Sequence, residues 1–353
     1  MGSAVFTSND VKAAPVLVSR AALARARGDV RAVVVNSGNA NACTGDAGMA
    51  DARAMIAATA AAVGVPRKHV LVASTGVIGQ RLPLARVEAG IGAAAATLGR
   101  GFDRFAEAIL TTDRGAKTAR RRVGGATLIG CTKGAGMIAP NMATTLTFVC
   151  TDAKLSRAAL DRATRRATEQ TFNAITVDGD TSTNDMLLVL ASGASGATPG
   201  GKAFDQALTD LLGDLAVQLM RGGEGVHHVV TVHVGGAKSV AAATAAARAI
   251  ANSPLVKTAI AGGDPNWGRF LSAAGNAGIR LRPERVDIWL DRVPIVRGGQ
   301  AAPGPDLEAR AARVMQRPEY TLRLDLGAGT AQARYLACDL SHEYVSINAD
   351  YRT

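Results

Sequence analysis

The segment Lys133–Leu146, KGAGMIAPNMATTL, joins a glycine-rich approach to two threonines that open an apolar strand. A threonine at the start of a strand is ordinarily a β-branched residue whose hydroxyl is satisfied locally. An internal threonine after a small residue has a second use, because its hydroxyl can attack the preceding carbonyl. Rearrangement to an ester and hydrolysis would leave Thr144 as a new N-terminus. Its α-amino group, with an unperturbed pKa of roughly 7.7–8, is then a built-in general base.

The composition around this segment is that of a folded globular protein. The chain has 353 residues, of which 48% are hydrophobic and 20% charged, so a disordered chain is excluded and two domains are allowed. The apolar stretch Ala54–Val65 is too short to span a bilayer, and the N-terminal residues lack the pattern of a signal peptide. We therefore expect a soluble, cytoplasmic protein with no membrane partner.

The formal net charge of +11 raises the question of nucleic acid binding. Arginines are scattered along the chain, the only dense run is Arg120–Arg122, and aromatic residues that would stack bases amount to 4%. No nucleic acid partner is expected. The cysteines form no Cys-x-x-Cys pair and have no histidine at metal-ligand spacing, so we expect reduced thiols and no metal. They are Cys43, Cys131, Cys150 and Cys338.

Strand and helix patterns alternate irregularly, which predicts the α+β class. Val70–Ala73 and Met186–Ala191 have the apolar runs of buried strands. The stretch Ser192–Lys202, SGASGATPGGK, has the composition of a linker. We therefore expect an N-terminal lobe over residues 1–195, which contains the threonine pair, and a C-terminal lobe over residues 196–353.

The sequence gives no sign of a nucleotide cofactor. Gly125–Thr132 has the outline of a phosphate loop but lacks the lysine directly before the hydroxyl residue. No Gly-x-Gly-x-x-Gly lies between a strand and a helix. A glycine-rich β-turn segment is the better interpretation.

Two loops follow predicted strands. NSGNAN at Asn36–Asn41 suits either a densely hydrogen-bonded site or a plain turn before a helix capped by Asp46, and the residues leave both open. STGVIG at Ser74–Gly79 offers a threonine hydroxyl and a glycine amide, the two kinds of donor that a tetrahedral oxyanion requires. A simple strand-to-helix turn is the alternative.

Three later segments are rich in polar groups. Gly222–Gly225 places one carboxylate, Glu224, in a glycine loop. Asp264–Arg269, DPNWGR, holds one of the two tryptophans, and the chain ends with Ser346–Thr353. Each is also typical of a solvent loop, a helix cap or an ordered tail.

Taken together, these segments resemble the ornithine acetyltransferase family of arginine biosynthesis, also called glutamate N-acetyltransferase. The resemblance implies a two-lobed αββα sandwich of the N-terminal-nucleophile type. The matching stretches keep the family's order over nearly the whole chain, and they are Ala13–Pro15, NSGNANACTG, STGVIG, Ile109–Asp113, KGAGMIAPNMAT, Gly223–Gly225, SPLVKTAI, DPNWGR and NADYRT.

The resemblance also implies a reaction. The precursor would cut itself between Ala143 and Thr144, and the fragments 1–143 and 144–353 would stay together as an α/β heterodimer that assembles further. Thr144 would take the acetyl group from N2-acetylornithine, and glutamate would receive it in a ping-pong sequence. No cofactor is implied, although some members of the family are multifunctional and also use acetyl-CoA as donor.

Site residues follow from the same resemblance, position by position. Thr75 and Gly76 match the oxyanion hole. The substrate-binding positions are Lys133, Thr144, Glu224, Asn348, Thr353 and one of the pair Thr111 and Thr112, of which we favour Thr112. Their chemistry is suitable, because Lys133 can hold a substrate carboxylate and Glu224 can pair with an ammonium of ornithine.

Some positions depart from the family's pattern. Val226-His227-His228 stands where Ala-Thr-Lys is expected, and Gly262-Gly263 replaces a bulkier, often acidic pair. An acyltransferase with a different amino-acid acceptor is therefore one alternative. An amidase or aminopeptidase that hydrolyses the acyl-enzyme with water is another, since it would share the same threonine.

Overall fold

The computed structural model describes residues 1–139 and 145–350, which form two compact units. The first unit comprises residues 1–139, 145–173 and 180–222, and the second comprises residues 174–179 and 223–350. The strands of the first unit are β1 (Gly2–Phe6), β2 (Ala32–Asn39), β3 (Val70–Val77), β4 (Lys117–Val123), β5 (Ala126–Lys133), β6 (Leu146–Thr151) and β7 (Met186–Ala191). Its α-helices are α1 (Ala14–Arg25), α2 (Gly45–Val63), α3 (Leu84–Ala96), α4 (Phe102–Ala108), α5 (Arg157–Gln170) and α6 (Gly201–Arg221).

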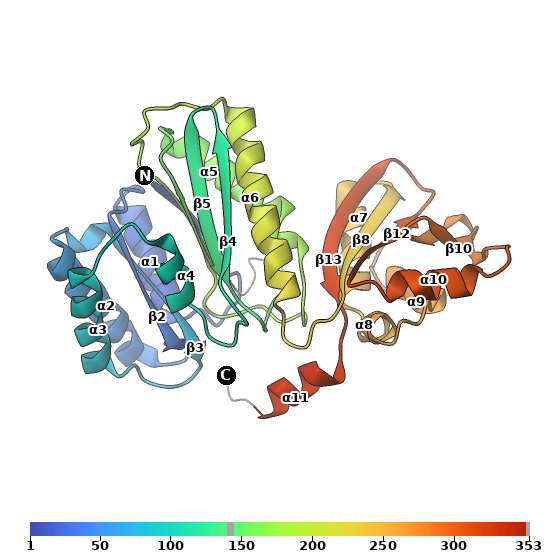
Figure 1. Cartoon of the computed structure of the whole chain (residues 1–353), viewed down its shortest axis with the longest axis horizontal. Coiled ribbons are helices and arrows are strands. Elements are labelled where there is room, and N and C mark those ends of the chain that lie inside the picture. Colours follow the sequence, from blue (N-terminus) through green and yellow to red (C-terminus); the bar gives the residue numbers. More distant parts are fainter. Residues whose placement is uncertain (140–144, 351–353) are drawn as a thin grey trace. The chain divides into compact units, whose positions relative to one another are not determined.

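Two sheets pack face to face in the first unit (Figure 1). The larger has the order β1-β7-β6-β5-β4 and is parallel only between β6 and β7, while β2 and β3 form a separate parallel pair. Leu71 and Ala73 of β3 are buried with Phe148 of β6 and Leu188 of β7. Strand β7, MLLVLA, is continuously apolar and almost entirely buried, as expected of an inner strand with both faces covered.

Helices cover the outer face of each sheet. On the smaller sheet, Met55 and Ile56 of α2 pack against Val70 and Val72 of β3. On the larger sheet, α6 lies along β4 and β5, and α5 lies beside α6 and β1 (Figure 1). The layers are therefore helix, sheet, sheet and helix. This arrangement confirms the α+β class and the αββα sandwich expected from the sequence.

The boundary between the units lies after Gly222 rather than at residue 195. The linker-like stretch Ser192–Lys202 belongs to the first unit, where Ser195 Oγ donates a hydrogen bond of 2.8 Å to the Asp152 carbonyl. Helix α6 follows directly and packs on the large sheet. Glycine, serine and proline suit an anchored surface loop as well as a linker, so composition alone misplaced the boundary.

The second unit is built on one six-stranded sheet of order β11-β10-β9-β12-β8-β13, in which only β8 and β12 pair in parallel. Ile250 of α7 and Phe270 of α9 are buried against Val232 and Leu322 of this sheet. The strands are β8 (Val229–Ala237), β9 (Asp287–Leu290), β10 (Val293–Arg297), β11 (Gln300–Ala301), β12 (Glu319–Asp325) and β13 (Ala331–Cys338). The α-helices are α7 (Val240–Asn252), α8 (Pro254–Ala261), α9 (Trp267–Gly275), α10 (Leu307–Met315) and α11 (His342–Asp350). None of the helices in the described ranges is long and apolar enough to cross a membrane.

Candidate active site

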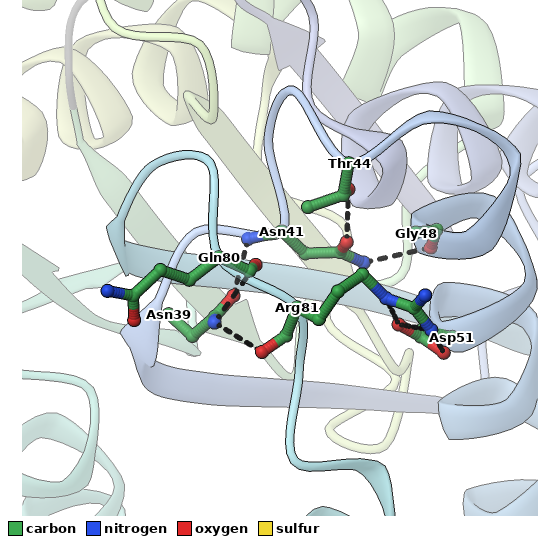
Figure 2. Close-up of polar contacts among 7 residues, drawn as sticks. All are labelled: Asn39, Asn41, Thr44, Gly48, Asp51, Gln80 and Arg81. Carbon is green, nitrogen blue, oxygen red and sulfur yellow. Dashed lines mark hydrogen bonds and ion pairs between the residues drawn. The ribbon is translucent and has the colours of Figure 1, made fainter.

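The asparagine-rich loop after β2 is held by its own amide side chains. Asn41 is fully buried, with a backbone φ of +48°, and its Nδ2 donates to the Gly48 carbonyl at 2.9 Å (Figure 2). Its Oδ1 accepts a hydrogen bond of 2.7 Å from the Thr44 hydroxyl. Thr44, not Asp46, is the residue that precedes α2, and Asp46 lies in the first turn, where its charge suits the helix dipole.

Asn39 fastens a second loop to the same strand end. Its Nδ2 donates to the carbonyls of Gln80 and Arg81, both at 3.2 Å, and the Arg81 guanidinium forms an ion pair with buried Asp51 at 3.0 Å (Figure 2). The side-chain amides of Asn39 and Asn41 therefore have a structural role, because they fix the loops that follow β2 and β3.

The backbone is irregular at the predicted oxyanion residues on β3. Gly76 has a φ of +129°, and a Cβ there would lie 2.2 Å from the carbonyl carbon of Gly38 on β2. Gly76 pairs with Gly38, and Asn39 pairs with both Thr75 and Val77, so the register of the ladder shifts at this point. Irregular pairing of this kind turns peptide groups away from the ladder and makes them available to a ligand.

A chain of contacts connects this strand end to the lysine at the end of β5. Ser37 pairs with Thr75, and its hydroxyl donates a hydrogen bond of 2.5 Å to the Leu110 carbonyl. The next residue, Thr111, accepts a hydrogen bond of 3.3 Å at its hydroxyl from Nζ of Lys133, whose side chain is buried. Thr111 is therefore the member of the threonine pair that receives this contact.

An ion pair buried below Lys133 fixes the backbone of the glycine-rich segment. Asp113 pairs with Lys117, and both side chains are almost completely excluded from solvent. Asp113 Oδ1 also accepts the Gly134 amide at 2.7 Å, and Oδ2 accepts the Thr111 amide at 3.3 Å. Burial alone would raise the pKa of the Asp113 carboxyl, but the Lys117 ammonium and the Gly134 amide together lower it below its usual range.

Strand β6 begins beside this cluster, since Leu146 is paired with Lys133. The predicted cleavage residues Ala143 and Thr144 and the predicted substrate-binding residue Thr353 lie outside the described residues.

In the second unit, two predicted substrate-binding residues meet. Asn348 Nδ2 of α11 donates a hydrogen bond of 3.0 Å to Glu224 Oε2, although the residues are far apart in the sequence. Ser341 Oγ binds the Gly225 carbonyl at 2.6 Å, and Gly225 has a φ of +64° that a larger residue would rarely adopt. The glycine loop is thus fastened to the start of α11.

The cysteines of the described ranges are free thiols, of which Cys43 is exposed and Cys131 and Cys338 are buried. No group of three or more histidine, cysteine or acidic residues there is arranged to hold a metal ion. Burial, together with the neighbouring Cys150, raises the pKa of the Cys131 thiol to about 12. In the segment that resembles a phosphate loop, Gly125 lies in the turn between β4 and β5, and the remaining residues belong to β5.

Sequence reasoning missed several residues of this region. Asp113 belongs to the family-like stretch Ile109–Asp113, in which a single acidic residue after two threonines does not indicate a buried ion pair. Asn184 Nδ2 donates to the carbonyls of Ala40 at 2.6 Å and Ser74 at 2.8 Å, and so joins the loop before β7 to both strand ends. Polar residues directly before the apolar strand β7 were the available signal.

Comparison with known proteins identifies relatives along the whole chain. A protein of Symbiobacterium thermophilum named arginine biosynthesis bifunctional protein ArgJ is 50% identical over 360 residues, which cover 99% of this chain and 89% of the relative. The crystal structure of the ArgJ protein of Bacillus halodurans is 37% identical, with a TM-score of 0.54 over 57% of this chain and 96% of that one. A structure titled ornithine acetyltransferase complexed with ornithine, from Mycobacterium tuberculosis, is also 37% identical, with a TM-score of 0.35 over 41% of this chain and 76% of that one.

The fold, the motifs and these relatives define an acyltransferase enzyme of arginine biosynthesis. More particularly, the chain belongs to the ArgJ family, whose model matches residues 1–353. The resemblance drawn from the sequence motifs is thereby confirmed.

Proposed function

We propose that this enzyme cuts itself between Ala143 and Thr144 and then transfers acetyl groups from N2-acetylornithine to glutamate. Thr144 is the nucleophile and carries the acetyl group between the two half-reactions. One pocket receives ornithine and glutamate in turn, so its polar groups serve two side chains of opposite charge.

The observation that carries this proposal is the clustering of the required chemistry at one end of the first unit. The irregular backbone at Thr75 and Gly76, the Lys133 ammonium with the Thr111 hydroxyl, and the start of β6 are joined by hydrogen bonds and strand pairing. Oxyanion donors and a cation near the strand that follows Thr144 are what acyl transfer through a threonine requires.

The roles of the remaining residues follow from their charges. Lys133 holds the α-carboxylate that both substrates share, and we assign the accompanying hydroxyl to Thr111 because of its contact with Lys133. Glu224 attracts the ammonium of ornithine, and Asn348 orients the Glu224 carboxylate by donating a hydrogen bond to it. Thr353 completes this proposed set.

Mass spectrometry under denaturing conditions tests the self-cleavage. The purified enzyme should consist of two fragments that end and begin at Ala143 and Thr144, and Thr144→Ala should remain one chain. A folded wild-type enzyme that stays intact would overturn the proposal.

Incubation of the cleaved enzyme with N2-acetylornithine tests the acceptor. Ornithine should accumulate together with N-acetylglutamate only when glutamate is present. Deacetylation that ignores glutamate would indicate a hydrolase, and transfer to another amino acid would indicate a different acceptor.

A further inference from the structure

Lys257 is a buried lysine for which the proposed reaction has no role. It lies in α8 of the second unit, and only 4% of the residue is exposed. Its Nζ donates to the carbonyl oxygen of Cys338 at 2.6 Å and to Sγ of the same residue at 3.3 Å. A buried ammonium is ordinarily paired with a carboxylate, whereas these partners in the described ranges are a peptide group and a thiol.

The Cys338 thiol is held with its sulfur facing the lysine. Cys338 is the last residue of β13 and is completely excluded from solvent. Its Sγ donates weakly to the Val177 carbonyl at 3.6 Å and accepts the hydrogen bond from Nζ of Lys257. The S–H hydrogen is therefore directed at the backbone, and a lone pair of the sulfur faces the lysine nitrogen.

At rest the pair consists of an ammonium beside an uncharged thiol. Burial raises the pKa of the Cys338 thiol and outweighs the Lys257 charge and hydrogen bond, which act to lower it. The carboxylates of Asp339 and Asp178 act in the same direction as burial. The two groups that Nζ contacts are thus both uncharged, which is an unfavourable environment for a buried ammonium.

We infer that Lys257 and Cys338 form a modification site, at which a peroxide joins the two side chains through one oxygen atom into a covalent N–O–S bridge. One peroxide oxidises the thiol to a sulfenic acid and leaves as water. A second peroxide then takes two electrons as the sulfenic oxygen bonds to the lysine nitrogen, and both of its oxygens leave as water. One thiol, one ammonium and two peroxides thus give the bridge, three waters and one proton.

Two features of the site favour this product. The inserted oxygen occupies part of the gap between Nζ and Sγ, so the side chains move less than a direct S–N bond would require. The bridge nitrogen is far less basic than an amine, because it carries an electron-withdrawing oxygen. The buried positive charge therefore disappears when the bridge forms, which suits the dry surroundings of Lys257.

The bridge would fasten two elements of the second unit to each other. Helix α8 lies beside β13, and the Leu340 amide donates to the Lys257 carbonyl at 3.2 Å (Figure 1). From Leu340 the chain continues into α11, which begins at His342. The bridge therefore fixes the point from which α11 leaves the sheet. It needs no step of the proposed acetyl transfer, so the two are tested separately.

Mass spectrometry of tryptic peptides from the purified, peroxide-treated enzyme tests the bridge. Trypsin should fail to cut at Lys257, and its peptide should be joined to that of Cys338. The joined pair should be heavier than the two peptides together by one oxygen and lighter by two hydrogens. Dithiothreitol should separate the peptides again, which irreversible sulfinic or sulfonic acids would not allow.

Variants of both partners check the assignment. Cys338→Ser keeps a small polar group beside the lysine and should lose the joined pair completely. Lys257→Met keeps the apolar stem of the side chain and should lose it as well, so either variant serves if the other does not fold.

Two further cysteines of the same chain are internal controls. Cys43 is exposed and should be oxidised first, which shows that the peroxide is active. Cys131 is buried as completely as Cys338, but its thiol neighbours Cys150 instead of a lysine, so it should gain no link to lysine.

Three results would overturn the inference and leave the proposed function untouched. Cys338 could stay a thiol after prolonged exposure that oxidises Cys43. It could be oxidised to sulfinic acid with Lys257 still free. It could also be joined to Lys257 without the extra oxygen, which would mean a direct S–N bond.

Discussion

At the scale of single residues, the candidate site depends on backbone positions that only one residue type can occupy. Gly76 combines a left-handed φ with the close approach of the Gly38 backbone, and neither strand can move without disturbing the other. The oxyanion role proposed for Thr75 and Gly76 therefore follows from main-chain geometry as much as from the threonine hydroxyl.

Gly76→Ala should destabilise the enzyme and abolish most transfer. The added methyl group meets backbone atoms in a strained conformation, so we expect a loss of about 3 kcal/mol or more in the free energy of unfolding. Urea denaturation and steady-state kinetics measure the two effects. Gly90→Ala is the control, because its Cβ would enter open space on the exposed face of α3 and should stabilise by about 0.5–1 kcal/mol.

Thr111→Val and Thr112→Val decide which threonine binds substrate. Removing the Thr111 hydroxyl leaves Lys133 without one of its contacts, so KM for both substrates should rise ~10-fold or more with a smaller change in kcat. Thr112→Val should raise KM by a smaller factor than Thr111→Val. A larger rise in KM for Thr112→Val than for Thr111→Val would assign the substrate-binding role to Thr112 instead.

At the scale of elements, a buried ion pair connects the loop before β4 to the end of β5. Asp113 binds the Gly134 amide and the Lys117 ammonium at once, so the glycine-rich segment begins from a fixed point. A glycine-rich chain needs such an anchor, since glycine loses the most conformational freedom on folding.

Asp113→Asn should lower stability near neutral pH by about 3–5 kcal/mol, because it leaves the Lys117 charge buried without a counter-ion. The lowered pKa of Asp113 sets the sign of the pH dependence: the ionised carboxyl stabilises above its unfolded pKa of roughly 3.9, and the benefit disappears as pH falls through the lower folded pKa. The difference in the free energy of unfolding between wild type and variant, measured by urea denaturation, should become smaller at acid pH. Asp161→Asn, which removes an exposed pair with Arg157, should change stability by at most ~1 kcal/mol at any pH.

At the scale of the whole molecule, the proposed scission would cut a chain whose two parts share one sheet. β5 lies before the cleavage point and β6 after it, and they pair in antiparallel register from Leu128 with Thr151 to Lys133 with Leu146. β1 from the first part also pairs with β7 from the second. The common core of the first unit thus includes residues from both fragments.

The cleaved enzyme should therefore behave as one particle under native conditions. Size-exclusion chromatography should show the fragments 1–143 and 144–353 eluting together, while denaturing electrophoresis separates them. Separation should require urea at a concentration that also unfolds the first unit. Fragments that part in dilute buffer would show that the shared sheet does not hold them.

The sequence by itself determined the family, the α+β class, the strand Met186–Ala191 and the stretches that supply the chemistry. These features can be predicted from apolar periodicity and short motifs, which involve only residues close together in the chain. Only the tertiary structure placed the unit boundary after Gly222, paired Lys133 with Thr111, gave Asp113 its partners and brought Lys257 into contact with Cys338. These depend on contacts between residues far apart in the chain and on exclusion from water, and no local pattern encodes either.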